Sequence, residues 1–438
     1  MAFRNNISYI FLPFSYMGAG NFEKVVNKVG SSPIWEPYQV EVKYLLKYVA
    51  EKFNMQNTDK CRCYHYTMKK ECRADYGLGT KEDIFYIKGD DYEHSFRVLG
   101  VHMYCFSTGV GIISLKLSYE ETDYLYISNA QYYLKKVSRT SIYKYGAEKD
   151  EGITLYDAAK SMLRIFDGVV KYDIFCYAND ETERANMLTL VDLPKKDDYE
   201  LELFYLRRGY SKNFLPLLND DFEDITFRSV NDLVWGISSE ASVCIMNTDG
   251  RQGEFLKSKF YENFNEQYLL MYVILLHQKY TLYTFLTETG TSDCDNLNKL
   301  EEYRHNLYRF EADFVFARVT EVPQYQKIYE KTYSAFSLEQ MYEDVREPLK
   351  SLSEIRIAAE KKEQRERDKR LNNSILLLSL LSVFSAVADG VQIAELFGTY
   401  KLIPTIIFAA APVVILIYIL ISLIFRRKDR SKNDRKKR

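Results

Sequence analysis

Leu402–Phe425 reads LIPTIIFAAAPVVILIYILISLIF, an apolar run without a charged residue. As a helix rising about 1.5 Å per residue it would measure roughly 36 Å, longer than the hydrocarbon core of a bilayer, which is about 30 Å thick. A second apolar stretch, 374–396, precedes it, and a basic tail, 426–438, follows it. We therefore expect residues 374–425 to form a transmembrane hairpin with spans at 374–396 and 402–425.

The rest of the chain has the composition of a large folded domain. The 438 residues include 37 Tyr and 15% aromatic residues, which suits a β-rich or mixed core. We predict an α+β ligand-sensing domain over 1–253, a helical stalk region over 254–373, the transmembrane hairpin, and the basic tail. Seven scattered cysteines without a pairing framework suit reduced thiols in the cytosol.

Basic residues lie on both sides of the hairpin. Lys361, Lys362 and Arg365 are among those before it, and 426–438 follow it, whereas Lys401 is the single basic residue of the connecting loop. The positive-inside rule then places both termini in the cytoplasm of a multi-pass inner-membrane protein. The first residues lack the pattern of a secretory signal. The tail is explained by anionic lipid, so we expect no nucleic-acid partner.

Hydrophobic periodicity predicts the elements of the soluble part. We expect strands at 8–14, 85–87, 95–106, 111–119, 199–206 and 241–246. We expect helices at 37–53, 128–137, 254–286 and 295–319, and one that opens at Pro323. From Leu338 to Ala359 apolar residues recur at steps of three and four, as in a coiled-coil seam, with Pro348 as the point where that helix would bend.

The first span carries a polar stripe. At steps of three or four it contains Ser379, Ser382, Ser385, Asp389 and Gln392, which share one helix face. A carboxylate inside a span usually faces a bundle interior or water, so we expect this face to line a pore formed by several copies of the chain. The alternative is that Asp389 lies at the outer interface and the serines bond their own backbone.

Two segments of the soluble domain could hold a phosphorylated ligand. Thr108, Gly109 and Gly111 lie in a glycine turn that would let a ligand approach backbone N–H groups, although a plain hairpin turn explains them too. Arg207, Arg208 and Lys212 surround an aromatic residue and suit a phosphate with a base; a solvated strand end is the alternative. Lys135, Lys136 and Arg139 form a second basic cluster.

Metal and catalytic motifs are sparse. Cys61, Cys63, His65 and Cys72 have a spacing that is unusual for zinc, so buried strand residues are the simpler interpretation. The sequence contains no P-loop, no G-x-S-x-G and no H-E-x-x-H. We therefore predict no catalytic residue and no enzyme, leave any metal site open, and expect no cofactor beyond a nucleotide ligand or a divalent cation.

The layout resembles the CorA family of divalent-cation channels. The stalk, the two spans and the basic tail carry the likeness, over 338–396 and 402–438. The resemblance implies a homopentamer whose first span lines the pore. The family's Gly-Met-Asn triplet is absent, because its place reads Ala-Asp-Gly-Val-Gln at 388–392. Its selectivity element therefore does not carry over.

Two further segments, CFSTGVGIISLKL at 105–117 and WGISSEASVCI at 235–245, are similar to CorA-like effectors of type III CRISPR systems. That likeness implies an antiviral channel opened by a nucleotide second messenger, a conjugate such as SAM-AMP or a cyclic oligoadenylate. A magnesium-type transporter and a membrane-tethered enzyme that degrades the messenger are the alternative functions.

Overall fold

The computed structural model describes residues 5–16, 18, 20–146, 152–175, 184–216, 226–230, 232–291, 297–396 and 410. The chain divides into two compact units, Met1–Leu349 and Lys350–Arg438. The first unit therefore includes most of the residues that we expected in a stalk after 253, because the helices that follow the strands pack with them.

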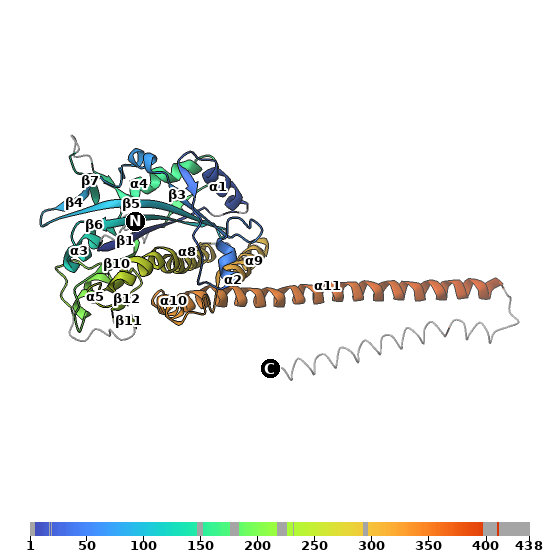
Figure 1. Cartoon of the computed structure of the whole chain (residues 1–438). Helices are drawn as coiled ribbons and strands as arrows, with labels where there is room; N and C mark the ends of the chain where they lie inside the picture. Colours follow the sequence, from blue (N-terminus) through green and yellow to red (C-terminus); the bar gives the residue numbers. More distant parts are fainter. Residues whose placement is uncertain are drawn as a thin grey trace. The chain divides into compact units, whose positions relative to one another are not determined.

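Within the described residues, thirteen strands form one mostly antiparallel sheet (Figure 1). Its main path runs β11-β12-β13-β10-β1-β6-β5-β4-β7-β8, with β3 beside β5, β2 beside β3 and β9 beside β1. The strands are β1 Asn6–Ser15, β2 Trp35–Pro37, β3 Cys63–Met68, β4 Phe85–Gly89, β5 Tyr92–Phe106, β6 Val110–Tyr119, β7 Ser141–Lys144, β8 Ile153–Thr154, β9 Asp173–Ile174, β10 Asn186–Asp192, β11 Thr226–Val230, β12 Leu233–Ile237 and β13 Ala241–Met246.

In the sequence, helices lie between these strands and after the last of them. The α-helices are α1 Asn21–Gly30, α2 Lys47–Ala50, α3 Tyr124–Leu134, α4 Leu155–Leu163, α5 Glu200–Leu206, α6 Gly253–Phe255, α7 Tyr261–Asn263, α8 Leu269–Thr291, α9 Leu297–Phe314, α10 Pro323–Ala335 and α11 Leu338–Leu396. Short 3₁₀ segments are η1 Glu51–Phe53, η2 Lys70–Tyr76 and η3 Arg164–Phe166. Two π-helical segments, η4 Leu256–Phe260 and η5 Phe264–Tyr268, interrupt the turns that lead into α8.

The central strands are buried on both faces because helices cover both (Figure 1). Ser8 on β1 and Thr189 on β10 bond to each other and to Gln131 of α3, whereas Tyr9, the residue after Ser8, bonds to Asn265 of η5. Successive strand residues point to opposite faces. The α3 helix therefore covers one face of the sheet, and the helical run from η5 into α8 covers the other.

Most expected elements are confirmed. The strands at 8–14, 85–87, 95–106, 111–119 and 241–246 and the helices at 254–286, from Pro323 and from Leu338 all form. The helix expected at 128–137 forms as α3 from Tyr124 to Leu134, and the one expected at 295–319 is described from Leu297 to Phe314.

Two predicted elements were wrong. The helix expected at 37–53 shrinks to α2 and η1, because Leu46 N–H donates to the Val319 carbonyl oxygen at 2.8 Å and Leu45 forms a bridge with Thr320. The strand expected at 199–206 is the helix α5, with Glu200 and Glu202 in its first turn. A short apolar run does not distinguish a strand from a buried helix by periodicity alone.

Helix α11 contains 59 residues. Leu338, Val345 and Leu349 are buried at its start, Pro348 lies inside it, and residues Ala358–Gly390 include a stretch long and apolar enough to cross a membrane. The α+β unit and one candidate apolar span are thus present. The expected second span at 402–425, apart from Ala410, and the tail at 426–438 lie outside the described residues.

Candidate basic-aromatic site

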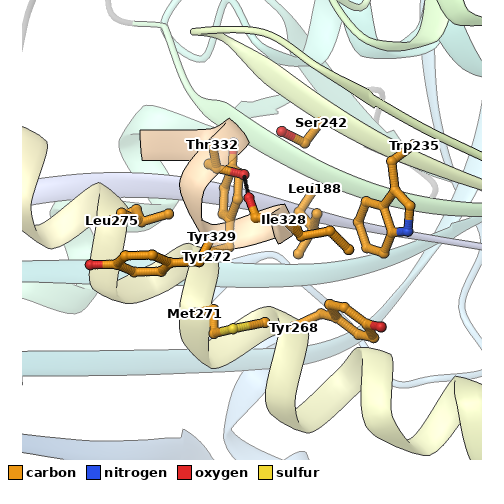
Figure 2. A pocket seen from close by; sticks show the side chains of 10 residues that line it. All are labelled: Leu188, Trp235, Ser242, Tyr268, Met271, Tyr272, Leu275, Ile328, Tyr329 and Thr332. Atoms are coloured by element: carbon orange, nitrogen blue, oxygen red, sulfur yellow. Dashed lines mark hydrogen bonds between the residues drawn. The ribbon is translucent and has the colours of Figure 1, made fainter. Parts of the chain in front are cut away.

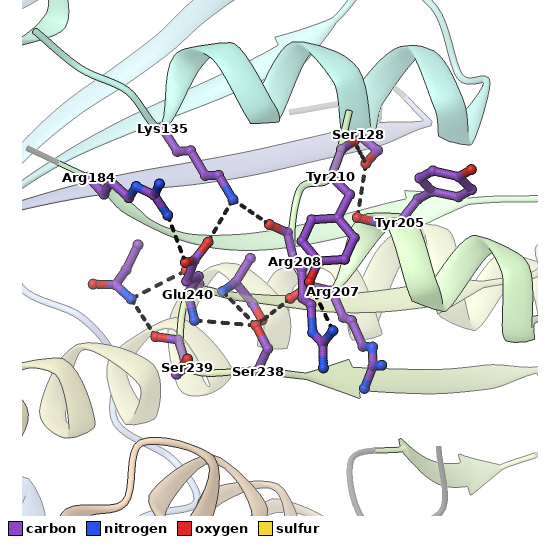
Figure 3. A network of polar contacts seen from close by, with 12 residues as sticks. Ser128, Lys135, Arg184, Tyr205, Arg207, Arg208, Tyr210, Ser238, Ser239 and Glu240 are labelled. Atoms are coloured by element: carbon purple, nitrogen blue, oxygen red, sulfur yellow. Dashed lines mark hydrogen bonds and ion pairs between the residues drawn. The ribbon is translucent and has the colours of Figure 1, made fainter. Parts of the chain in front are cut away.

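The structure brings together two basic clusters that are far apart in the sequence. The Lys135 Nζ atom donates to the Arg208 carbonyl oxygen at 2.8 Å and to Glu240 Oε2 at 2.6 Å (Figure 3). Arg184 reaches the other oxygen of Glu240 at 3.1 Å. We name the basic-aromatic patch by its members: Tyr132, Lys135, Lys136, Arg184, Arg208 and Tyr210.

Local hydrogen bonds fix the loop that carries Arg208. The Ser128 hydroxyl of α3 lies 2.9 Å from the Tyr205 carbonyl oxygen and 2.6 Å from that of Tyr210 (Figure 3). Gly209 has φ +54°, a left-handed conformation that glycine adopts without a Cβ penalty, and it turns the chain after α5. The Ser128 hydroxyl of α3 therefore ties this loop to the helix.

The Glu240 carboxylate forms ion pairs with Lys135 and Arg184 and so neutralises part of the positive charge at the centre of the patch. Lys135 is 3% exposed; burial lowers the pKa of its ammonium group, and the Glu240 charge opposes that shift. Burial raises the pKa of Glu240, but Lys135 and Arg184 outweigh it, so this pKa lies below its usual value. The Arg184 side chain is 44% exposed, so it faces both Glu240 and solvent.

Aromatic rings lie beside the more accessible cations. The Lys136 Nζ atom is 3.7 Å from the centroid of the Tyr132 ring, and the Arg208 guanidinium is 5.5 Å from that of Tyr210. Tyr210 stacks on Phe214, which is 46% exposed, with 5.2 Å between centroids. Basic groups beside accessible rings can bind a phosphate together with a flat base.

The other predicted residues of this segment have different surroundings. Arg207 is fully buried, and its carbonyl oxygen accepts a hydrogen bond from Ser238 at 2.6 Å. Only Arg208 of the arginine pair is partly exposed. Lys212 is exposed and donates through Nζ to the Asp91 carbonyl oxygen at 3.4 Å. Sequence reasoning missed Arg184 and Glu240, since nothing in their local sequence relates them to α3.

The glycine turn at Thr108–Gly111 packs against α8. The Thr108 hydroxyl lies 2.7 Å from His277 Nε2 and 3.2 Å from the Thr281 hydroxyl. Gly109 has φ +86°, and a Cβ atom on Gly111 would lie 2.1 Å from Cζ of Phe14. These contacts favour the interpretation of the turn as a hairpin that anchors a helix.

The polar stripe of the candidate span lies on one continuous helix. Ser379 donates to the Ile375 carbonyl oxygen at 2.8 Å, as the backbone-bonding alternative expects. Ser382, Ser385, Asp389 and Gln392 are exposed in the single chain. Their spacing along α11 therefore keeps the stripe available to neighbours in an assembly.

A small cavity lies among α8, α10 and the sheet (Figure 2). Its lining is mainly apolar and includes Trp235, Tyr268, Met271 and Ile328, together with the hydroxyl-bearing Ser242. It leaves about 10 Å³ for the centre of a water molecule. Ligand sites usually measure hundreds of Å³, so this space suits about one water and no nucleotide.

Among the described residues, no group of three or more His, Cys, Asp or Glu side chains is arranged to hold a metal ion. Cys61 and Cys63 are buried, and the Cys61 thiol lies 3.2 Å from the Cys63 carbonyl oxygen. His65 instead contacts His102 on the neighbouring strand, with 3.1 Å between Nε2 and Nδ1.

Comparison with known proteins gives no relative: no protein-family model, no curated protein and no solved structure matches this chain.

Proposed function

We propose that the chain is a homo-oligomeric CorA-like membrane channel, opened when a nucleotide second messenger binds its N-terminal unit. The observation that carries the proposal is the continuity of α11. Leu338 and Val345 are buried in the first unit, and the same helix continues to Leu396 through the candidate span. A change in the first unit that tilts or shifts the start of α11 would act directly on the span.

The candidate span supports an assembly. Leu377, Leu378, Leu381 and Phe384 are 60–63% exposed in one chain, as residues that face lipid or a neighbouring helix would be. The polar stripe on the same helix needs polar or aqueous surroundings. Ring symmetry supplies them by turning each stripe toward a common axis. The second span at 402–425 would complete a hairpin, and the CorA resemblance favours five copies in the inner membrane with both termini cytoplasmic.

The basic-aromatic patch is the proposed messenger site. Arg184, Lys136 and Arg208 offer cations for a phosphate, and Tyr210 with Phe214 offers rings for a base. An adenylate, either SAM-AMP or a cyclic oligoadenylate, combines both groups. A role as an antiviral effector of a type III CRISPR system would follow from that ligand class.

Dye release from vesicles tests the function directly. The full chain is reconstituted into dye-loaded vesicles, and SAM-AMP or a cyclic oligoadenylate is added. We expect one of these to release dye from vesicles that contain the parent chain. Combining Lys136→Ala with Arg208→Ala should abolish most of the release, because each charge-assisted contact contributes roughly 1.5–3 kcal/mol.

The matched control removes two exposed cations from α1, through Lys24→Ala with Lys28→Ala. This control should release dye like the parent. Release that no adenylate changes would contradict a nucleotide-gated channel. Equal release from the patch variant would contradict the location of the site.

A further inference from the structure

A second polar group lies on the sheet face opposite α3. Lys116 on β6 pairs with Tyr9 on β1 and with Gly100 on β5. His102 on β5 pairs with Ser114 on β6. Residues paired across neighbouring strands share one face of a sheet. These side chains therefore lie next to one another on the face that η5 covers.

Lys116 is a partly buried cation without a counter-ion. Its Nζ atom lies 2.6 Å from the amide oxygen of Asn265 and within 5.5 and 5.7 Å of the ring centroids of Tyr9 and Tyr261. No carboxylate in the described part of the chain forms an ion pair with it. Burial, with a smaller effect of Lys81, lowers the pKa of Lys116 to about 8, so the group keeps most of its charge at neutral pH.

Two neighbouring polar atoms lack a hydrogen-bond partner among the described residues. They are the Ser114 hydroxyl, on a residue that is 0% exposed, and Nδ1 of His65, on a residue that is 7% exposed. Buried polar atoms of folded proteins are nearly always bonded to protein, water or a ligand. Ser114 lies directly across from His102, whose Nδ1 is 3.1 Å from His65 Nε2.

The group around Lys116 is closely packed and reaches solvent at its edge. A Cβ atom on Gly100 would lie only 3.2 Å from His102 Nε2 and 3.7 Å from Lys116 Cβ, so His102 and Lys116 lie close together over the Gly100 backbone. Tyr38 borders the group, with its ring centroid 5.4 Å from that of His102, and is 40% exposed. Lys116 and His102 are themselves partly exposed. A small ligand could therefore reach the cation from solvent.

We propose that Lys116, Ser114 and His102 form a second binding site, which takes the oxyanion of a small carboxylate or phosphate ligand. Lys116 supplies the positive charge, and the Ser114 hydroxyl and an imidazole N–H supply donors, which an oxyanion can accept together. The site is separate from the basic-aromatic patch, because the two lie on opposite faces of the sheet. It does not depend on the proposed channel function.

Thermal unfolding with small anions tests the site. The full chain in detergent micelles is titrated with inorganic phosphate or with acetate against chloride at equal ionic strength, and tryptophan fluorescence gives the unfolding midpoint. At ten times the dissociation constant the midpoint of the parent should rise by about 2 °C. Acetate as the more effective anion would indicate a carboxylate ligand, and phosphate a phosphoryl ligand.

Lys116→Met keeps an apolar stem and removes the charge, so it should abolish the rise. Ser114→Ala should reduce the rise and serves if Lys116→Met does not fold. Lys88→Met, a matched change of an exposed lysine on β4, should leave the rise intact. No rise in the parent with either anion, or an equal rise in Lys116→Met, would overturn the proposal.

Discussion

Replacing Gly111 by alanine separates the two roles considered for the glycine turn. The added Cβ would lie 2.1 Å from Cζ of Phe14 and 2.6 Å from both of its Cε atoms. Phe14 is 0% exposed and is bordered by the rings of Tyr16 and Phe166, at centroid distances of 5.9 and 6.1 Å. Overpacking of a filled core typically costs about 1–3 kcal/mol, and so close an approach to an enclosed ring belongs at the upper end.

The expected loss converts into a measurable temperature. Unfolding entropy is about 2.1 cal/mol/K per residue, which gives roughly 0.7 kcal/mol/K for the unit Met1–Leu349. A loss of about 3 kcal/mol then lowers the midpoint by about 4 °C. The chain contains two tryptophans, Trp35 and Trp235, which are 3% and 1% exposed in this unit, so their fluorescence reports its unfolding in the full chain.

Gly30→Ala is the matched control for Gly111→Ala. A Cβ atom on Gly30 would meet only the Tyr66 hydroxyl, at an ordinary 3.7 Å, and the residue ends α1. Its midpoint should stay level or rise slightly, since alanine favours a helix more than glycine does. If Gly111→Ala unfolded within 1 °C of the parent yet lost the response to nucleotide, the packing argument would fail and a ligand role would be restored.

Three further outcomes are expected. Thr108→Val should lower the midpoint by about 1–4 °C, because His277 loses its partner at a cost of about 1–3 kcal/mol, while the response to nucleotide stays; an unchanged midpoint would argue against the anchor. Lowering the pH from 7 to 5 should destabilise the first unit by up to about 2 kcal/mol for each histidine whose pKa is lowered by burial. Below pH 6.5 these histidines are protonated in the unfolded chain but stay neutral in the folded chain, so acid favours unfolding. An unfolding midpoint that does not change with pH would contradict this. The histidines concerned are His65, His94, His102 and His277, with pKa values of about 4 for His94 and about 3 for His102. Asp389→Asn should lower cation flux through vesicles and Asp389→Lys should abolish cation preference, with a smaller effect of Ser382→Ala; flux like the parent's in all three would remove Asp389 from the pore.

The candidate site could be predicted only in part from the sequence. Two clusters of basic residues can be recognised in the sequence, at Arg207–Lys212 and at Lys135–Arg139. The structure joins them through the hydrogen bond from Lys135 to the Arg208 carbonyl oxygen. That Arg207 is buried whereas Arg208 is partly exposed depends on how α5 packs on the sheet. Adjacent arginines give no local sign of that difference.

The polar group around Lys116 could not be predicted from the sequence at all. Lys116, His102 and Ser114 are unremarkable in the sequence, within strands that read as ordinary buried segments. They come together because β5 and β6 pair in one register, and a shift of that register by one residue would turn each side chain to the other face. The pairing therefore creates the site.

By itself, the sequence determined the elements whose cause is local. Short, mainly apolar runs give β1, β5, β6 and β13, and apolar residues at helical spacing give the run into α8 and the start of the helix from Leu338 to Leu396. Only the tertiary structure decided the rest. The segment before α2 is extended because Val319 and Thr320 pair with its backbone, and α5 is a helix because its apolar face packs on β12 and β13. The glycine turn is an anchor because His277 and Phe14 occupy the space around it. Such contacts join residues that are distant in the sequence, 273 positions apart for Leu46 and Val319, and no local pattern of side chains encodes which distant partner will be present.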